Sequence, residues 1–322
     1  MSVPRVSILM SVREGAFLEP AVRTATAQTM DDFELVLIDD ASDEETAALV
    51  RDLAAADARI RLVRRDRSAG LAAALNHGLT LVRAPLVARA DADDEYAPHR
   101  LEAQLAVIDA RPDLGVLSCG YERIDEAGRV TGTHRPVTGP GRLAFRQMFQ
   151  NQVLHPGAMF RTALVREAGG YDAAYWTAQD SDLWARLLGR TEIDNLAEPL
   201  VRWRKHGAST LASRGAAGQA LSGTVTARLM TDYLGAPVAV PAASAAAAVW
   251  RSQADLRTDD AQVGLALLKR IRSAARMKGE PTRTRDLSVH VAGELVRRAK
   301  RAPREARAMP GLLASWMTGG TP

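Results

Sequence analysis

The sequence has little cysteine, few aromatic residues and no long apolar run. Cys119 is the only cysteine among 322 residues, which excludes an intrachain disulfide and favours a reducing compartment. No stretch approaches the ~18 uncharged apolar residues of a membrane-spanning helix, and no signal-peptide core precedes the first strand-like run, Val6–Met10. We therefore expect a cytoplasmic protein that does not cross a membrane, with Cys119 buried in its core.

The net charge is also small, at +4, but positive charge is concentrated near the C-terminus. Six basic residues lie in Arg297–Arg307 against one acid, and the apolar segment Met309–Met317 follows. Two alternatives are open: a peripheral contact with anionic lipid on the inner membrane face, or a helix packed on the rest of the chain. Nucleic-acid binding is not expected, because the basic cluster lacks interleaved aromatic residues and a recognition motif.

What the first half does contain is an alternation of short Val-, Ile- and Leu-rich runs with longer segments of helical spacing. This pattern is typical of buried parallel strands joined by crossover helices. The chain is therefore expected to form an α/β fold with an open, mixed, mostly parallel sheet flanked by helices. The expected strands are Val6–Met10, Glu34–Asp39, Ile60–Arg64, Leu86–Ala90 and Leu200–Arg204, the expected helices are Phe17–Gln28, Glu44–Ala55 and Leu71–Arg83, and Tyr121–Pro140 reads as loops or a hairpin.

The composition changes beyond about residue 210. The later part is rich in Ala and Arg and has helical spacing, as in Ala242–Val249 and Val263–Ile271. We predict an α/β domain over residues 1–210 and a mainly helical C-terminal segment over residues 211–322.

Acidic residues follow one expected strand at once, as Asp91-Ala92-Asp93-Asp94. Open α/β sheets bind ligands beyond the carboxyl ends of their strands. Clustered carboxylates repel one another unless a cation lies between them, and oxygen ligands suit Mg²⁺ or Mn²⁺. The expected occupant is a divalent metal that bridges a diphosphate. The alternative is a solvated acidic turn that caps the helix beginning near Pro98.

Two other strand ends favour a nucleotide. Asp40 can accept a hydrogen bond from a base or a ribose hydroxyl, since Ser42 or Asp43 can cap the next helix instead. Gly70 opens a helix after a basic strand end, where free N–H groups and guanidinium groups favour phosphate. Most glycines at such a position serve only packing or backbone geometry, so Gly70 alone decides little.

In order along the chain, eight blocks resemble family 2 glycosyltransferases of the GT-A fold, over roughly residues 4–210. The blocks are Val6–Glu14, Gln28–Glu34, Asp39–Ser42, Gly70–Leu79, Asp91–Asp94, His155–Phe160, Gly169–Asp172 and Ala178–Trp184. The resemblance implies an inverting, metal-dependent, hexosyltransferase-like enzyme that moves a sugar from a nucleotide diphosphate donor, with UDP the expected nucleotide, to an acceptor hydroxyl. It also implies a saccharide or lipid-linked acceptor, in surface polysaccharide or glycolipid synthesis.

The resemblance implies roles for single residues at the donor. Arg13 stands where many members have an aromatic residue that stacks on the base, and Ser68 stands where Asn is common. A guanidinium can also stack on a base, but the identity of the base becomes less certain. The residues implied at the base and ribose are Ser11, Arg13, Glu14 and Asp40, and those implied at the ribose and the diphosphate-bound metal are Asp91 and Asp93.

Further residues are implied on the acceptor and phosphate side. Asp180 matches the family's general base and follows Gln179, where Glu is frequent; the alternative for Asp180 is the N-cap of a helix. His206 matches a loop that returns over the diphosphate and its metal. His155 can contact phosphate or acceptor, or be structural, and Trp184 can be core or an acceptor platform.

Two other classes of function stay open. A sugar nucleotidyltransferase uses a related sheet and the same metal chemistry, although Ser11–Gly15 is a poor version of its Gly-rich loop. A non-catalytic protein that binds a nucleotide sugar within a polysaccharide assembly is the other alternative. Pyrophosphate as product would indicate the first, and no turnover the second.

Overall fold

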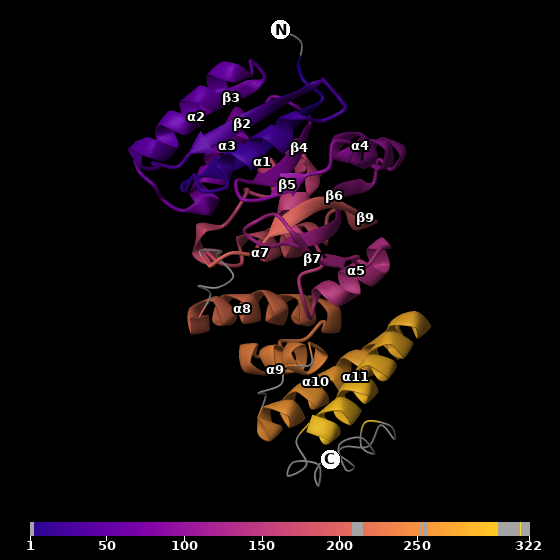
Figure 1. Ribbon diagram of the computed structural model, residues 1–322. Coiled ribbons are helices and arrows are strands. Elements are labelled where there is room, and N and C mark those ends of the chain that lie inside the picture. The colour runs from indigo at the N-terminus through magenta and orange to yellow at the C-terminus, as the bar shows by residue number, and fades with distance from the viewer. Residues whose placement is uncertain (1–2, 208–214, 252, 254–256, 302–315, 317–322) are drawn as a thin grey trace. The chain divides into compact units, whose positions relative to one another are not determined.

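The computed structural model describes residues 3–207, 215–251, 253, 257–301 and 316 (Figure 1). The chain divides into two compact units. Unit 1 comprises Met1–Leu143 and Gln152–Gly218, and unit 2 comprises Ala144–Asn151 and Gln219–Pro322. The assignment of Ala144–Asn151 to unit 2 was not expected from the sequence. The domain limits 1–210 and 211–322 stay a prediction.

The described strands of unit 1 form one sheet. They are β1 (Val6–Val12), β2 (Phe33–Asp39), β3 (Ile60–Arg64), β4 (Leu86–Asp91), β5 (Glu95–Tyr96), β6 (Leu114–Ile124), β7 (Val130–His134), β8 (Met159–Arg161) and β9 (Glu192–Arg204). Their order is β3-β2-β1-β4-β8-β6-β9-β5, with β7 paired to β6. β3, β2, β1 and β4 are parallel, as are β6 and β9, whereas β8, β5 and β7 pair antiparallel with their neighbours. The carboxyl ends of β1, β2 and β4 therefore lie at one edge.

Helices cover both faces of this sheet. They are α1 (Leu18–Thr26), α2 (Glu44–Ala56), α3 (Leu71–Leu81), α4 (Arg100–Ala110), α6 (Thr162–Glu167) and α7 (Gln179–Leu187), with short 3₁₀ turns at His155–Gly157 and Ala173–Tyr175. The residues of α5 (Pro140–Gln147) are divided between the two units. Ile8 and Met10 of β1 pack in one core cluster with α1, α2 and α4, whereas Leu9 packs in another with α3, α6 and α7. Burial of alternate side chains on both faces explains the uninterrupted apolar runs of these strands.

The predicted fold class is confirmed: in one mixed sheet, β3, β2, β1 and β4 form an all-parallel half, and the other half combines parallel and antiparallel pairs. The last strand is longer than predicted, because it begins at Glu192 and not at Leu200. Residues Glu192–Asn195 pair with β6, and irregular register near Pro199 joins the two parts of β9. That pairing is a long-range contact, so the local pattern did not reveal it. The Gly- and Pro-punctuated stretch contains the β6–β7 hairpin, as one alternative predicted.

The described part of unit 2 is helical, as predicted for the C-terminal segment. Its helices are α8 (Gly215–Leu234), α9 (Val240–Trp250), α10 (Thr258–Met277) and α11 (Pro281–Arg301). The Trp250 ring stacks between Phe149, with ring centroids 4.5 Å apart, and His290, at 4.1 Å. These stacked rings help to join the segment Ala144–Asn151 to α9 and α11 within unit 2.

The basic and apolar C-terminal segments lie largely outside the described residues. For Arg297–Arg307, only the helical backbone as far as Arg301 is described. Trp316 is 1% exposed, and the Arg272 guanidinium lies 4.2 Å from its ring and donates to its carbonyl at 2.8 Å. Trp316 is therefore packed against Arg272, as in the second predicted alternative. Among the described residues, no helix has both the length and the apolar character needed to cross a membrane.

Candidate active site

The acidic residues after β4 form a compact cluster. One carboxylate oxygen from each of Asp91, Asp93 and Asp94 lies within 4.8 Å of the others. Asp94 is 1% exposed, and its Oδ1 accepts from the backbone N–H of Arg204 at 2.8 Å. Its Oδ2 is buried and has no hydrogen-bond partner among the described residues. The helix that follows, α4, has His99 at its N-cap and no side-chain cap. The alternative of a solvated acidic cap is therefore wrong.

Burial and mutual repulsion make this cluster electrostatically costly. Burial raises the pKa of Asp94 well above its usual range, and the charges of Asp93 and Asp91 raise it further. Burial also raises the pKa of Asp91, with Arg89 opposing the shift and Asp93 and Asp180 adding to it. Oxygen-only ligands, repulsion and an unpartnered buried Oδ2 are the features that a divalent cation would satisfy. The residues therefore fit the predicted metal.

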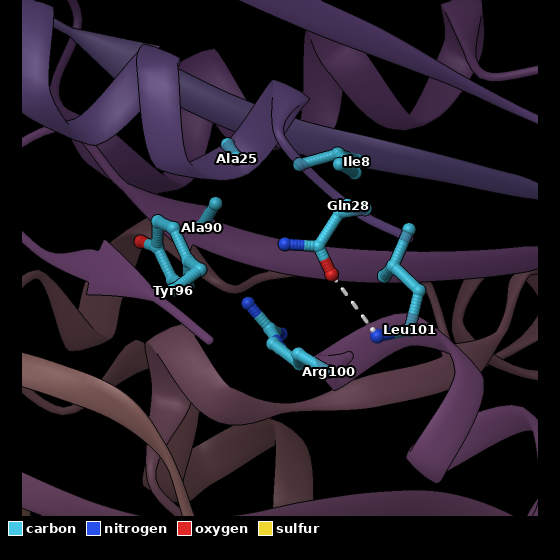
Figure 2. A pocket seen from close by; sticks show the side chains of 7 residues that line it. All are labelled: Ile8, Ala25, Gln28, Ala90, Tyr96, Arg100 and Leu101. Carbon is cyan, nitrogen blue, oxygen red and sulfur yellow. Dashed lines mark hydrogen bonds between the residues drawn. The ribbon is translucent and has the colours of Figure 1, made fainter. Parts of the chain in front are cut away.

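Two buried side chains, Arg89 and Tyr96, donate hydrogen bonds to Asp91. Arg89 is fully buried and donates from Nη2 to Asp91 Oδ1, while its Nε has no hydrogen-bond partner. The Tyr96 hydroxyl donates to the Asp91 carbonyl at 2.8 Å. A small void of about 10 Å³ lies beside Tyr96. Figure 2 shows Tyr96, Arg100 and Gln28 among the residues that line it. A single water needs about this much room, so the side chains around the void, including Tyr96, are closely packed.

The end of β9, which pairs with β5, also lies at the acidic cluster. His206 Nε2 lies 2.9 Å from Asp93 Oδ2, and the His206 ring lies 5.0 Å from that of Phe17, just before α1. The structure thus brings together the two side chains, Asp93 and His206, that were predicted to hold the metal.

The nucleotide residues predicted at β1, β2 and α3 lie beside the cluster. Ser11 is paired in register with Asp91 across β1 and β4. Asp40 is buried, and its carboxylate accepts from Arg65 and, at 2.7 Å, from the Ser68 hydroxyl. Arg13 donates to the same Ser68 oxygen at 3.1 Å. The two positions that depart from the family pattern therefore contact each other and share a polar network with Asp40.

The start of α2 agrees with one of the two predicted capping residues, Asp43. Asp43 caps α2 by accepting from the Thr46 N–H at 2.8 Å, so Asp40 is not used as a cap. Gly70 precedes α3 with a φ of 87°, a conformation that favours glycine. Glu14 is exposed after β1, and no side-chain partner is found for it among the described residues.

Asp180 lies in the first turn of α7, close to the acidic cluster. It is 8% exposed, and its charge acts on both Asp91 and Tyr171. The N-cap position of α7 is Ala178, with no side-chain cap, so the capping alternative for Asp180 is wrong. The neighbouring Gln179 is also buried, and its Oε1 has no hydrogen-bond partner.

His155 and Trp184 belong to the packed interior. His155 Nε2 lies 3.0 Å from the Tyr171 hydroxyl, and its ring packs against Trp184. Burial lowers the pKa of His155 well below its usual value, with the charge of Arg89 adding to the effect, so the imidazole is neutral. Trp184 is fully buried, which confirms its core alternative.

Sequence reasoning missed Arg89, Arg204 and Tyr171. An arginine inside an otherwise apolar strand, just before an acidic cluster, was a usable signal for Arg89. No local pattern singled out Tyr171 or Arg204, whose contacts come from distant segments.

A second cleft has no part in this site. It has a volume of about 690 Å³ and lies where β2 and β3 begin, at the opposite edge of the sheet. Its lining mixes both charges, with Arg59, Arg61 and Glu34 among its residues. None of the candidate residues lines it.

The chain is similar to known proteins over most of its length. Residues 7–168 match the family model described as glycosyl transferase family 2. The O-antigen biosynthesis glycosyltransferase WbnJ of Escherichia coli is 28% identical over 71% of this chain and 92% of its own length. The uncharacterized protein y4gI of Sinorhizobium fredii is 31% identical over 65% of this chain, but the match spans only 23% of that protein.

Two solved structures share the fold. TarS of S. aureus, residues 1–349 in complex with UDP-GlcNAc, aligns with 98% of this chain and 92% of its own, with a TM-score of 0.60 and 14% identity. The mannosyltransferase PcManGT of Pyrobaculum calidifontis, in complex with GDP-Man and Mn²⁺, aligns with 92% of this chain and 87% of its own, with a TM-score of 0.53 and 21% identity. The GT-A fold expected from the sequence is thereby confirmed.

Proposed function

Since this chain belongs to glycosyl transferase family 2, we propose that it transfers a sugar from a nucleoside diphosphate donor to an acceptor hydroxyl, with inversion at the sugar carbon. The observation that carries the proposal is the convergence of three kinds of group at one sheet edge. Asp40 offers a buried carboxylate for a nucleoside, the Asp91–Asp94 cluster suits a cation, and Asp180 is a carboxylate close to that cluster. Donor, cation and base are the components that such a reaction needs.

The donor would lie across the carboxyl ends of β1, β2 and β4. Ser11, Arg13, Glu14 and Asp40 would hold the base and ribose, with Asp91 at the ribose. The N–H groups that open α3 at Gly70 would face phosphate. UDP is the proposed nucleotide, and GDP is the competing choice, because solved relatives of the same fold carry UDP-GlcNAc and GDP-Man.

Asp93, with Asp91 and Asp94, would hold Mg²⁺ or Mn²⁺, and His206 would be a further ligand or a phosphate contact. When bound, such a cation neutralises the negative charge that grows on the diphosphate. Arg89 would keep Asp91 in place throughout, because it is buried and paired with that carboxylate.

Asp180 would act as the general base. It would take the proton of the acceptor hydroxyl as the acceptor oxygen forms a bond to the sugar C1, and the bond from C1 to the diphosphate oxygen would break on the opposite face. The electron pair of that bond leaves with the nucleoside diphosphate, so one displacement inverts the configuration. Gln179 would contact the acceptor or a phosphate. Because its imidazole is buried, His155 would influence the acceptor or phosphate only indirectly, through its hydrogen bond with the Tyr171 hydroxyl.

The acceptor would be a saccharide or a lipid-linked saccharide in surface polysaccharide or glycolipid synthesis. Two relatives carry names from this area: WbnJ, in O-antigen biosynthesis, and AmsE of Erwinia amylovora, in amylovoran biosynthesis, which is 28% identical over 58% of this chain and 70% of its own length. A lipid-linked acceptor would make a peripheral contact of the basic stretch Arg297–Arg307 with anionic lipid productive. Liposome flotation of the full chain and of a chain ending at Glu294 tests this contact. Equal recovery of both in the soluble fraction at low salt would exclude it.

The decisive experiment pairs donor binding with product identity. Unfolding temperatures are measured with UDP-, dTDP- and GDP-sugars, with and without Mn²⁺; a donor at 100 times its Kd stabilises the fold by about 2.7 kcal/mol. The stabilising donor is then incubated with acceptor extracts, and release of nucleoside diphosphate is measured. Pyrophosphate in its place would identify a nucleotidyltransferase, and stabilisation without any turnover would favour a non-catalytic binding protein.

A further inference from the structure

Arg204, the last residue of β9, is a buried arginine with an unusually large set of contacts. It is 3% exposed. Its Nε donates to the Asp93 carbonyl at 2.9 Å, its Nη2 to Glu95 at 2.6 Å, and its Nη1 to the carbonyls of Asp125 and Glu126 at 3.0 and 3.1 Å. All three guanidinium nitrogens are thus bonded to the protein.

These bonds join three segments that are far apart in the sequence. Asp93 belongs to the acidic cluster, and Glu95 begins β5 directly after it. Asp125 and Glu126 lie in the turn between β6 and β7, and the backbone N–H of Arg204 itself donates to Asp94. β5 and β9 are also paired as antiparallel strands, and they lie together in Figure 1. The Arg204 side chain therefore bonds the acidic segment and the β6–β7 turn to the end of β9.

The same side chain is linked to His206. The Arg204 guanidinium lies 4.7 Å from the centre of the Phe17 ring, and the His206 ring lies 5.0 Å from the same ring. The intervening Lys205 N–H donates to the Ile124 carbonyl at 2.9 Å, which extends the pairing with β6 by one residue. His206 thus leaves a fixed strand end and meets Asp93 at 2.9 Å.

We propose that Arg204 is a positioning residue of the donor site, which brings Asp93, Asp94 and His206 into register before the cation and the donor arrive. This inference rests on the proposed function, because it takes the acidic cluster as the cation site. The role needs a guanidinium: a planar fork reaches acceptors in several directions at once, whereas a lysine ammonium on a flexible stem cannot hold Asp93, Glu95 and the turn carbonyls together. Glu95 balances the buried charge.

Arg202 provides a matched control from the same strand. It pairs with the same carboxylate, Glu95, and donates to the Gly128 carbonyl at 2.6 Å, but its side chain is 40% exposed. None of its described hydrogen bonds reaches Asp93, Asp94 or Phe17. Loss of Arg202 therefore removes a similar charge without removing the link to the acidic cluster.

The test is the affinity of the free protein for Mn²⁺, measured by calorimetry without donor, below the unfolding temperature of each variant. Arg204→Lys is expected to weaken Mn²⁺ binding by about 10- to 100-fold, the usual effect of removing a residue that orients metal ligands. Arg202→Gln is expected to bind Mn²⁺ like the wild type. Phe17→Leu leaves every ligand and every hydrogen bond of Arg204 in place and is expected to weaken Mn²⁺ binding by a smaller factor.

The outcomes separate the inference from the proposed function. Wild-type protein that does not bind Mn²⁺ would refute the cation site itself. Wild-type binding with equal affinity in Arg204→Lys, or an equal loss in Arg202→Gln, would overturn the role of Arg204 and leave the proposed function standing. If Arg204→Lys does not fold, Glu95→Gln decides, because it removes the ion pair of Arg204, and Arg202→Gln controls for the loss of the second pair of Glu95. Unchanged Mn²⁺ affinity in Glu95→Gln would then overturn the inference.

Discussion

Two carboxylates on one helix should behave in opposite ways when each is changed to its amide. Asp180 and Asp182 both lie in the first turn of α7, and both are buried, at 8% and 1% exposure. Asp182 accepts from Arg186 Nε at 2.8 Å, and Arg186 also donates to the carbonyls of Ala168 and Gly170. The charge of Asp180 instead raises the pKa of Asp91 and of Tyr171. The Asp182–Arg186 pair therefore stabilises the fold, whereas Asp180 lies at the candidate site.

Asp180→Asn should lower kcat by about 10²- to 10⁴-fold, which is the contribution of a well-placed general base. At about 1.36 kcal/mol for each factor of ten, this equals about 2.7–5.4 kcal/mol in activation free energy. Donor affinity should stay almost unchanged, because proton removal matters only in the transition state. The unfolding temperature should not fall, since the Asp180 side chain caps no helix and loss of its negative charge relieves repulsion with Asp91.

Asp182→Asn should instead cost stability. Breaking a buried ion pair costs about 3–5 kcal/mol, but Asn keeps one acceptor and Arg186 keeps two carbonyl partners, so about 2–3 kcal/mol is expected. For a domain of this size, that lowers the unfolding temperature by about 4–12 °C. Turnover per folded molecule should stay close to that of the wild type.

The assay combines release of nucleoside diphosphate at saturating donor, donor Kd by calorimetry, and thermal unfolding by circular dichroism for both variants. Normal turnover in Asp180→Asn would refute its role as the base. So would a pattern in which Asp180→Asn loses stability as Asp182→Asn does and recovers full activity at low temperature, because Asp180 would then be structural.

Three further predictions concern other parts of unit 1. Asp93→Asn should abolish Mn²⁺-dependent stabilisation by the donor while the unfolding temperature without ligand stays the same; unchanged donor affinity with Mn²⁺ in calorimetry would exclude the metal assignment. The pKa of His155 is lowered in the fold, so stability should fall as pH drops below about 6.5, where the unfolded chain takes up the proton. His155→Gln should reduce that fall, and an unaltered pH dependence of the unfolding temperature would contradict the assignment. Gly169→Ala and Gly170→Ala both introduce a side chain at positive φ, at a cost of about 1–2 kcal/mol, but only at Gly170 would the new Cβ lie 2.4 Å from Asn76 Oδ1. Chemical denaturation should therefore show a larger loss for Gly170→Ala by about 1–3 kcal/mol, and equal losses would mean that Asn76 moves aside freely.

The parallel half of the fold could be predicted from local sequence, because each of its signals lies within a few residues. Burial on both faces requires continuous apolar runs such as Val6–Met10, and the next helix begins at a recognisable cap, Asp43. The general rule that parallel strands present their carboxyl ends at one edge then places Asp40 and Asp91 together without knowledge of the tertiary structure. Family resemblance added Asp180, whose spacing alone favoured a helix cap.

Tertiary structure decided which distant residues complete the site. The contact between His206 and Asp93 spans 113 residues, and the bond from Arg204 to the Asp93 carbonyl spans 111. The ion pair of Asp40 with Arg65, the hydrogen bond of His155 with Tyr171 and the approach of Asp180 to Asp91 likewise depend on how the sheet closes. Such contacts form only after the entropy of closing long loops has been overcome by the packing of the whole domain. Local propensity acts over a few residues, so it determines the strands, the turns and their caps, while the packing of both halves of the sheet determines the partners of the acidic cluster.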